Sequence, residues 1–135
     1  MPKESTSSES KYRPQMASFS FYLTNQFVWI SVSVGIVFFL VGRLMKNYPP
    51  PDINGLAGYR TSRSMKNQES WDFAQVEAGK KMSRFGKIGI LIGLISLMIP
   101  LSDPWDLYLG MIWVLVSCSL LIYSVEKSLK QKFGK

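Results

Sequence analysis

The stretch FVWISVSVGIVFFLVGRLM, residues 27–45, decides the fold class, because it is apolar over 19 residues and Arg43 is its only charge. As a helix it rises about 28 Å, which is close to the thickness of the hydrocarbon core of a bilayer. Trp29 lies near its start, and such a side chain suits the headgroup boundary. We therefore predict a transmembrane helix over residues 27–45.

Two further apolar stretches follow at residues 85–101 and 107–125, and the turn SDPWD at residues 102–106 separates them. Pro104 cannot continue a helix, so the two stretches are predicted to form a tight antiparallel hairpin. Lys87 lies one turn inside the second stretch, and its long side chain can reach back to the interface. The sequence thus predicts an all-α membrane protein with three transmembrane helices.

Small residues recur within the first two apolar stretches. Gly35 and Gly42 lie seven residues apart, and Gly89 and Gly93 form a GxxxG pair. Glycines at such intervals let the backbones of two membrane helices come close together. We therefore predict that these four glycines form the packing faces of the first and second helices.

Composition narrows the function classes. The chain has 135 residues, enough for one domain, and 16 Lys and Arg against 9 Asp and Glu give a net charge of +7. Basic proteins often bind nucleic acid, but the apolar stretches leave too little polar chain for a soluble binding domain, so no nucleic-acid partner is expected. His is absent and Cys118 is the only cysteine. Without these side chains we expect no metal site, no cofactor and no catalytic centre.

Lysine and arginine counts predict the orientation, because basic loops stay in the cytosol. Nine of these residues lie from Arg43 to Lys87, four lie in the basic C-terminal tail at residues 126–135, and three lie in the polar segment at residues 1–26. The N-terminal segment at residues 1–26 is expected to be a disordered tail followed by an interfacial stretch. With three spans, the first loop and the C-terminus share a side. The counts therefore predict an outer N-terminus and a cytosolic C-terminus.

The loop at residues 46–84 combines an irregular first half with a helical second half. Prolines at positions 49, 50 and 51 end the first helix and force an extended exit. Asn67 is a good helix cap, and Trp71, Ala74, Ala78, Met82 and Phe85 then recur at three- and four-residue steps. This pattern predicts an amphipathic cytosolic helix, on the membrane surface or against the helix bundle, that leads into the second span.

Two interpretations compete for Arg60 and Arg63 in the irregular half. They are either cytosolic charges that touch lipid phosphates, or Arg60 belongs to a defined anion site with Thr61 and Ser64. Nearby glycines and hydroxyls could present backbone N–H groups to an anion. From the residues alone the first interpretation is favoured, because the Gly-Lys-Ser/Thr of a phosphate-binding loop is missing.

This loop resembles the SdpI family of bacterial membrane proteins. The residues in register with the family pattern, which are also the candidate binding residues, are Asn54, Gly58, Tyr59, Arg60, Thr61, Ser64, Asn67 and Trp71. Gly79 also fits, whereas Gln75 stands where many members carry His and Ser62 stands where many carry Pro. Position 75 therefore lacks the titratable group that would support a pH- or metal-linked role.

The resemblance implies a short, three-span member in the bacterial cytoplasmic membrane. Its expected function is non-enzymatic protection against a membrane-active peptide toxin, or signalling of that toxin, with the bilayer, the peptide and a membrane or cytosolic protein as partners. The alternative is a small accessory or scaffold subunit of a larger membrane complex, which the glycine-rich faces and a tendency to form oligomers would suit. A lipid-modifying enzyme is the weakest hypothesis, since no acid–base pair stands near a nucleophile.

Overall fold

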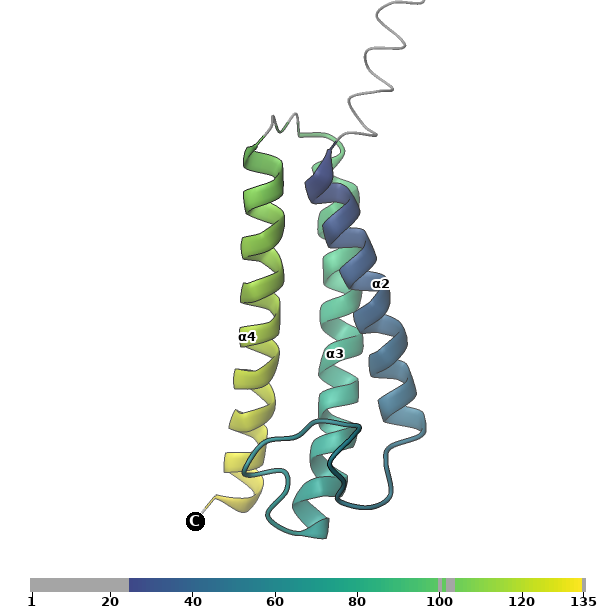
Figure 1. The fold of residues 1–135 in the computed structure, drawn as a ribbon, viewed down its shortest axis with the longest axis vertical. Coiled ribbons are helices and arrows are strands. Elements are labelled where there is room, and N and C mark those ends of the chain that lie inside the picture. The colour runs from purple at the N-terminus through teal and green to yellow at the C-terminus, as the bar shows by residue number, and fades with distance from the viewer. Residues whose placement is uncertain (1–24, 100, 102–103, 135) are drawn as a thin grey trace, which may run out of the picture.

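The computed structural model describes residues 25–99, 101 and 104–134. Its elements are three helices, α2 (Gln26–Asn47), α3 (Gln68–Ser96) and α4 (Trp105–Phe133), and the described residues contain no strand. Figure 1 shows α3 antiparallel to both neighbours, with the loop between α2 and α3 at the same end as the C-terminus. The all-helical prediction is therefore confirmed. Of the tail and interfacial segment predicted at residues 1–26, residues 1–24 lie outside the described residues, as do turn residues 102–103, while Asn25 and Gln26 cap and begin α2.

Helix α2 corresponds to the first apolar stretch. The side chain of Asn25 caps its N-terminus by accepting a hydrogen bond from the Val28 N–H at 3.3 Å. Its 22 residues rise about 33 Å, and the prolines that follow end it as expected. Because each Pro lacks an N–H and disfavours helical geometry in the preceding residue, the chain leaves α2 extended.

Helix α3 differs from the expectation of a separate amphipathic helix before the second span. The amphipathic segment and the second apolar stretch form one continuous helix of 29 residues, capped by Asn67, whose side chain accepts from the Ser70 N–H at 2.8 Å. No proline stands between the two parts, so nothing interrupts the hydrogen bonds of the helix backbone. Of the two placements considered, the amphipathic part lies against the bundle, with Trp71, Ala74 and Ala78 buried.

Helix α4 is longer than the third apolar stretch, because most of the expected C-terminal tail is helical. Lys130 and Lys132 lie in its last turn, where positive charges interact favourably with the partial negative charge of a helix C-terminus. Leu121, Val125 and Leu129 form its buried stripe, which packs against Ala74 and Ala78 of α3. The hydrophobic core therefore lies toward the loop end of the bundle.

Helices α2 and α3 pack much more closely than either packs with α4. At Gly35 and Gly42, an added Cβ atom would lie 2.7 and 2.5 Å from the backbone nitrogens of Ile90 and Ser83. The Ser31 hydroxyl also donates to the Gly89 carbonyl at 2.8 Å across this interface. On α3 the closest approaches to the backbone of α2 occur at Gly79 and Gly86, which are not among the four glycines predicted to pack.

The two glycines of the predicted pair, Gly89 and Gly93, differ in how closely α2 approaches them. A Cβ at Gly93 would lie 2.6 Å from the Val32 Cγ2, whereas one at Gly89 would meet its nearest neighbour at 3.4 Å, an ordinary contact. The tight positions on α3 are therefore Gly79, Gly86 and Gly93, which repeat every seven residues. Seven residues are close to two helical turns, so these glycines share one face.

The surface of the bundle is strongly apolar. By length and composition α2 and α4 are both able to cross a membrane, and only 22% of the apolar part of each is buried inside the protein. In the described residues α3 does not meet the same criterion, because its uncharged helical part after Lys87 runs only from Ile88 to Ser96. Exposed apolar surface on this scale indicates a membrane protein.

The end opposite the loop carries a buried carboxylate, Asp106. One carboxylate oxygen accepts a hydrogen bond from the backbone N–H of Gln26 at 2.9 Å, and the other accepts from the N–H of Leu107 at 2.8 Å. Asp106 is 1% exposed. It therefore supplies negative charge to the N-termini of α2 and α4 together, which is the favourable end of each helix dipole.

Candidate functional site

The loop between α2 and α3 passes across the first turns of α3 and reaches the C-terminal part of α4 (Figure 1). Its first anchor is Trp71, which is fully buried and donates its indole N–H to the Pro50 carbonyl at 2.9 Å. Gln68 donates to the neighbouring carbonyl of Pro51 at 2.5 Å. The start of the loop is thus held against the first turn of α3.

Asn54 and Gly58 shape the next part of the loop. The Asn54 side-chain oxygen accepts from the N–H groups of Leu56 and Ala57 at 3.0 and 2.8 Å, which makes a local turn. Gly58 has a φ of 105°, in the region that favours glycine, and a Cβ there would lie 2.4 Å from the Gln75 Oε1. Both residues therefore set the path of the backbone.

Gln75 fastens the loop to α3. Its buried side chain accepts a hydrogen bond from the Tyr59 N–H at 2.6 Å and donates one to the Tyr59 carbonyl at 2.9 Å. The amide thus satisfies both backbone groups of one residue, as a neighbouring strand would. Gln75, which has no titratable group, thus has a structural role: it holds the loop on α3.

Thr61 and Ser64 close a small turn after Tyr59. The Thr61 N–H donates to the Ser64 hydroxyl at 2.8 Å, and the Ser64 N–H donates to the Thr61 hydroxyl at 3.2 Å. The fully buried Ser64 hydroxyl also lies 3.0 Å from the Tyr59 carbonyl, to which it can donate. These hydrogen bonds hold the turn closed from within.

Glu126 of α4 interacts with the side chains of the turn and of Tyr59 before it. One carboxylate oxygen accepts from the Thr61 hydroxyl at 2.6 Å and from the Tyr59 hydroxyl at 3.2 Å, and the other lies 3.4 Å from the Arg63 guanidinium. We call Tyr59, Thr61, Ser64, Gln75 and Glu126 the loop clasp. It joins the loop to α3 and α4 at once.

Charge and burial keep the Tyr59 hydroxyl protonated. Burial, and then the nearby negative charge of Glu126, raise the pKa of this phenol well above its usual range. A protonated hydroxyl remains a donor, and the carboxylate next to it remains an acceptor. The contact is therefore a charge-assisted hydrogen bond at neutral pH.

A second polar contact joins α3 and α4 beside the clasp. The Lys81 ammonium group lies 3.5 Å from Glu77, donates to the Ser128 hydroxyl at 2.6 Å and also donates to the Ser124 carbonyl. Its side chain is only 16% exposed. This lysine is thus neutralised within the bundle, and its hydrogen bonds fix α4 beside α3.

The candidate residues therefore separate into two groups. Asn54, Gly58, Tyr59, Thr61, Ser64, Asn67 and Trp71 all shape the loop or hold it on α3 and α4. Arg60 is exposed, and its guanidinium makes no hydrogen bond or ion pair within the described residues. The anion site considered for Arg60, Thr61 and Ser64 is not assembled, since both hydroxyls bond within the clasp.

Glu126 and Lys81 hold the loop and α4 in place, and sequence reasoning did not identify them. One signal was present for Glu126, because it is the only acidic residue after Asp106 and stands at the start of a basic tail. Within the described part of the chain, no three His, Cys, Asp or Glu side chains gather as metal ligands would. The chemistry that the site offers is hydrogen bonding between a loop and two helices.

Comparison with known proteins shows that one family sequence model covers this loop together with α3 and most of α4. The sequence model of the SdpI/YfhL protein family matches residues 52–125, from the loop through α3 and most of α4. A relative from Bacillus subtilis (strain 168), the uncharacterized protein YfhL, is 33% identical over 97 residues, which cover 71% of this chain and 82% of the relative. No solved structure matches the chain.

Proposed function

Because the chain belongs to the SdpI/YfhL protein family, we propose that it protects a bacterial cell against a membrane-active peptide toxin, or signals the presence of that toxin. It acts by binding, without catalysis. The observation that carries this proposal is the loop clasp, which ties a polar loop to two helices with largely exposed apolar surfaces. A peptide that packs between those helices in the bilayer would act directly on the loop.

The proposal includes a topology in the cytoplasmic membrane. The helices α2 and α4 each cross the bilayer, and the second apolar stretch of the sequence, which begins within α3, provides the third span. The loop and the C-terminus lie in the cytosol, and the N-terminus lies outside. The distribution of basic residues supports this orientation, and the antiparallel order of the helices suits it.

The face of α4 is the proposed binding surface for the peptide. This helix packs loosely on α2 and α3, and large apolar side chains along it are exposed, including Ile112, Leu115, Leu120 and Tyr123. In a bilayer such a face meets lipid or another helix, and packing decides between them. An amphipathic peptide would compete with lipid for this face.

Sensitivity to membrane-active peptides tests the proposal. A strain that lacks the gene is expected to be more sensitive to at least one member of a panel of such peptides, and the wild-type gene restores resistance. Arg60→Ala is expected to lower resistance at normal expression, because Arg60 is exposed and has no structural contact within the described residues. Lys66→Ala, another exposed loop cation, is the matched control.

Trp71→Ala separates folding from function in the same assay. Trp71 is fully buried, so its loss should lower the amount of protein in the membrane together with resistance. Unchanged sensitivity of the deletion strain across the whole panel would refute a protective function.

A second candidate function is that of an accessory subunit in a larger membrane complex. The loose packing and exposed face of α4 also favour a permanent protein neighbour. Purification in a mild detergent from cells grown without toxin distinguishes the two. A stoichiometric membrane partner under those conditions favours the subunit, and its absence favours protection.

A further inference from the structure

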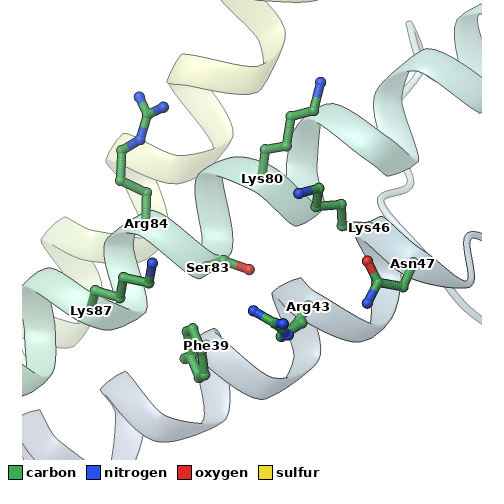
Figure 2. A pocket seen from close by; sticks show the side chains of 8 residues that line it. All are labelled: Phe39, Arg43, Lys46, Asn47, Lys80, Ser83, Arg84 and Lys87. Carbon is green, nitrogen blue, oxygen red and sulfur yellow. The ribbon is translucent and has the colours of Figure 1, made fainter.

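A cationic cavity lies between the end of α2 and the middle of α3, away from the loop clasp. It has a volume of about 350 Å³. Five of its eight lining residues are Lys or Arg and none is acidic; the cations are Arg43, Lys46, Lys80, Arg84 and Lys87. Figure 2 shows Arg43, Lys46 and Lys87 directed toward the space between the two helices, with Phe39 below it and Ser83 at its centre, whereas the side chains of Lys80 and Arg84 extend away from α2.

Among the described residues, no acidic side chain forms an ion pair with the cations of this cavity. The ion pairs of the described residues use Arg63 and Lys81, and neither lines the cavity. Arg43 and Lys87 instead lie over the ring of Phe39, at 6.0 and 5.7 Å from its centre. Like charges that line one cavity repel one another, so an anion that enters the cavity lowers this electrostatic repulsion.

Ser83 adds an unused polar group to the same space. Its hydroxyl oxygen is buried and has no hydrogen-bond partner among the described residues. Gly42 leaves the room for it, since a Cβ on Gly42 would lie 2.7 Å from that oxygen. A buried hydroxyl without a partner is costly, and an anionic oxygen would accept its proton in a hydrogen bond.

The height of the cavity along the helices identifies the source of the anion. Arg43 is the only charge in the first apolar stretch, and Lys87 is the last charge before the uncharged part of α3. Phe39 lies one turn of α2 further into the apolar part, followed by Leu40, which is exposed over 59% of its surface. Cations at the edge of an apolar surface lie at the level of lipid phosphates in a bilayer.

We propose that this cavity binds the phosphate headgroup of an anionic phospholipid in the leaflet next to the loop. Ammonium and guanidinium groups from both helices hold the phosphate, the Ser83 hydroxyl donates to it, and Phe39 meets the start of the lipid chains. The lipid thereby links α2 to α3 and offsets the repulsion between their cations. This inference does not depend on the existence of a toxin.

Native mass spectrometry of the full chain in a non-ionic detergent tests the proposal. The protein is titrated separately with phosphatidylglycerol, phosphatidylcholine and inorganic phosphate. Phosphatidylglycerol is expected to bind as a discrete adduct, about tenfold more tightly than phosphatidylcholine, because only the former keeps a net negative charge. Equal binding of the two lipids would overturn the proposal. Binding of inorganic phosphate as tightly as phosphatidylglycerol would reassign the cavity to a free ion.

A pair of matched variants locates the lipid. The double variant R43Q/K87Q should weaken phosphatidylglycerol binding about tenfold, because two charged donors are lost from the cavity. The control K127Q/K130Q removes the same charge from exposed positions on α4 and should change binding less than about twofold. Equal losses in both would mean a general effect of net charge and would contradict a defined cavity.

Ser83→Ala keeps the test decisive where the double variant folds poorly. It removes only the hydroxyl and leaves every charge in place, so its fold should be retained, as circular dichroism checks. Phosphatidylglycerol binding is expected to weaken about threefold, in line with one lost hydrogen bond. Unchanged affinity in Ser83→Ala, together with unchanged affinity in a single Lys87→Gln variant, would overturn the proposal.

Discussion

At the scale of single residues, the amide of Gln75 decides whether the loop stays on the bundle. It bonds both backbone groups of Tyr59 and is fully buried. Gln75→Ala should leave these two groups without partners, at a cost of about 1–3 kcal/mol each. Limited trypsin digestion should then cut faster after Arg60 and Arg63. Gln131→Ala, at an exposed position of α4, is the control and should digest like wild type.

Because of the Tyr59 hydroxyl, the stability of the loop clasp is expected to fall as the pH becomes alkaline. Its pKa in the folded protein is raised above the value of 10.0 for a free tyrosine, first by burial and then by Glu126. The folded state therefore holds the proton more tightly, and this stabilisation is complete below pH 10 and is lost as the pH rises further.

We therefore predict that trypsin cleavage of the loop accelerates as the pH rises above 10, after correction for the protease's own pH profile. Tyr59→Phe should digest faster than wild type at neutral pH, since the hydrogen bond to Glu126 is lost. Its loop cleavage should then change little with pH. A pH profile of Tyr59→Phe as steep as that of wild type would assign the effect to another group.

Sequence reasoning at this scale found the loop residues but not their partners. Asn67 and Trp71 follow local rules for caps and burial, whereas Asn54 and Gly58 were identified by their match to the family pattern. Glu126 is 65 residues from Thr61 in the chain, and only the packing of α4 on the loop brings them together. A single chain carries no local signal for such a contact.

At the scale of elements, the glycines of α2 and α3 determine how closely these helices approach. Gly86→Ala should destabilise the bundle by about 1–3 kcal/mol, as overpacked sites do, because its Cβ would lie 2.4 Å from the Phe39 nitrogen and 2.6 Å from the Gly35 carbonyl oxygen. Gly89→Ala is the matched control on the same helix, since its nearest contact is 3.4 Å. Thermal unfolding in detergent measures both.

Helix propensity sharpens this comparison. Alanine in place of glycine favours a helix by up to about 1 kcal/mol, so Gly89→Ala should be neutral or stabilising. A loss of stability in Gly89→Ala equal to that in Gly86→Ala would mean that the two helices pack differently. The GxxxG pattern predicted the correct face of α3. It did not predict how close α2 comes at each glycine, because that distance depends on how the two backbones cross.

The continuity of α3 illustrates another limit of sequence patterns. Its first half is amphipathic and its second half is apolar, and this change of character suggested two elements in succession. The backbone responds to helix breakers rather than to hydropathy, and no proline lies within it. The apolar stretches did predict where α2 and α4 lie, because their length and composition leave few other structures.

At the scale of the whole molecule, the arrangement of charges predicts how the protein sits in a membrane. The loop and the C-terminus lie at one end of the bundle. A C-terminal green fluorescent protein should fluoresce, and an N-terminal alkaline phosphatase with its own export signal removed should be active only if it reaches the outside. Activity of both reporters supports three spans with an outer N-terminus. An inactive phosphatase on a stably inserted fusion would contradict it.

The carboxylate of Asp106 has a mechanical consequence. It holds the first turns of α2 and α4 together, while the loop clasp holds the other end of α4. The Lys81 contact and the apolar packing around Val125 lie at the same end. Release of the clasp together with these contacts would leave Asp106 as a pivot, about which α4 could swing but not slide. Because 29 residues rise about 43 Å, a rotation of about 10° moves the free end by about 7 Å. A small change at one end of the bundle would thereby be amplified into a lateral displacement.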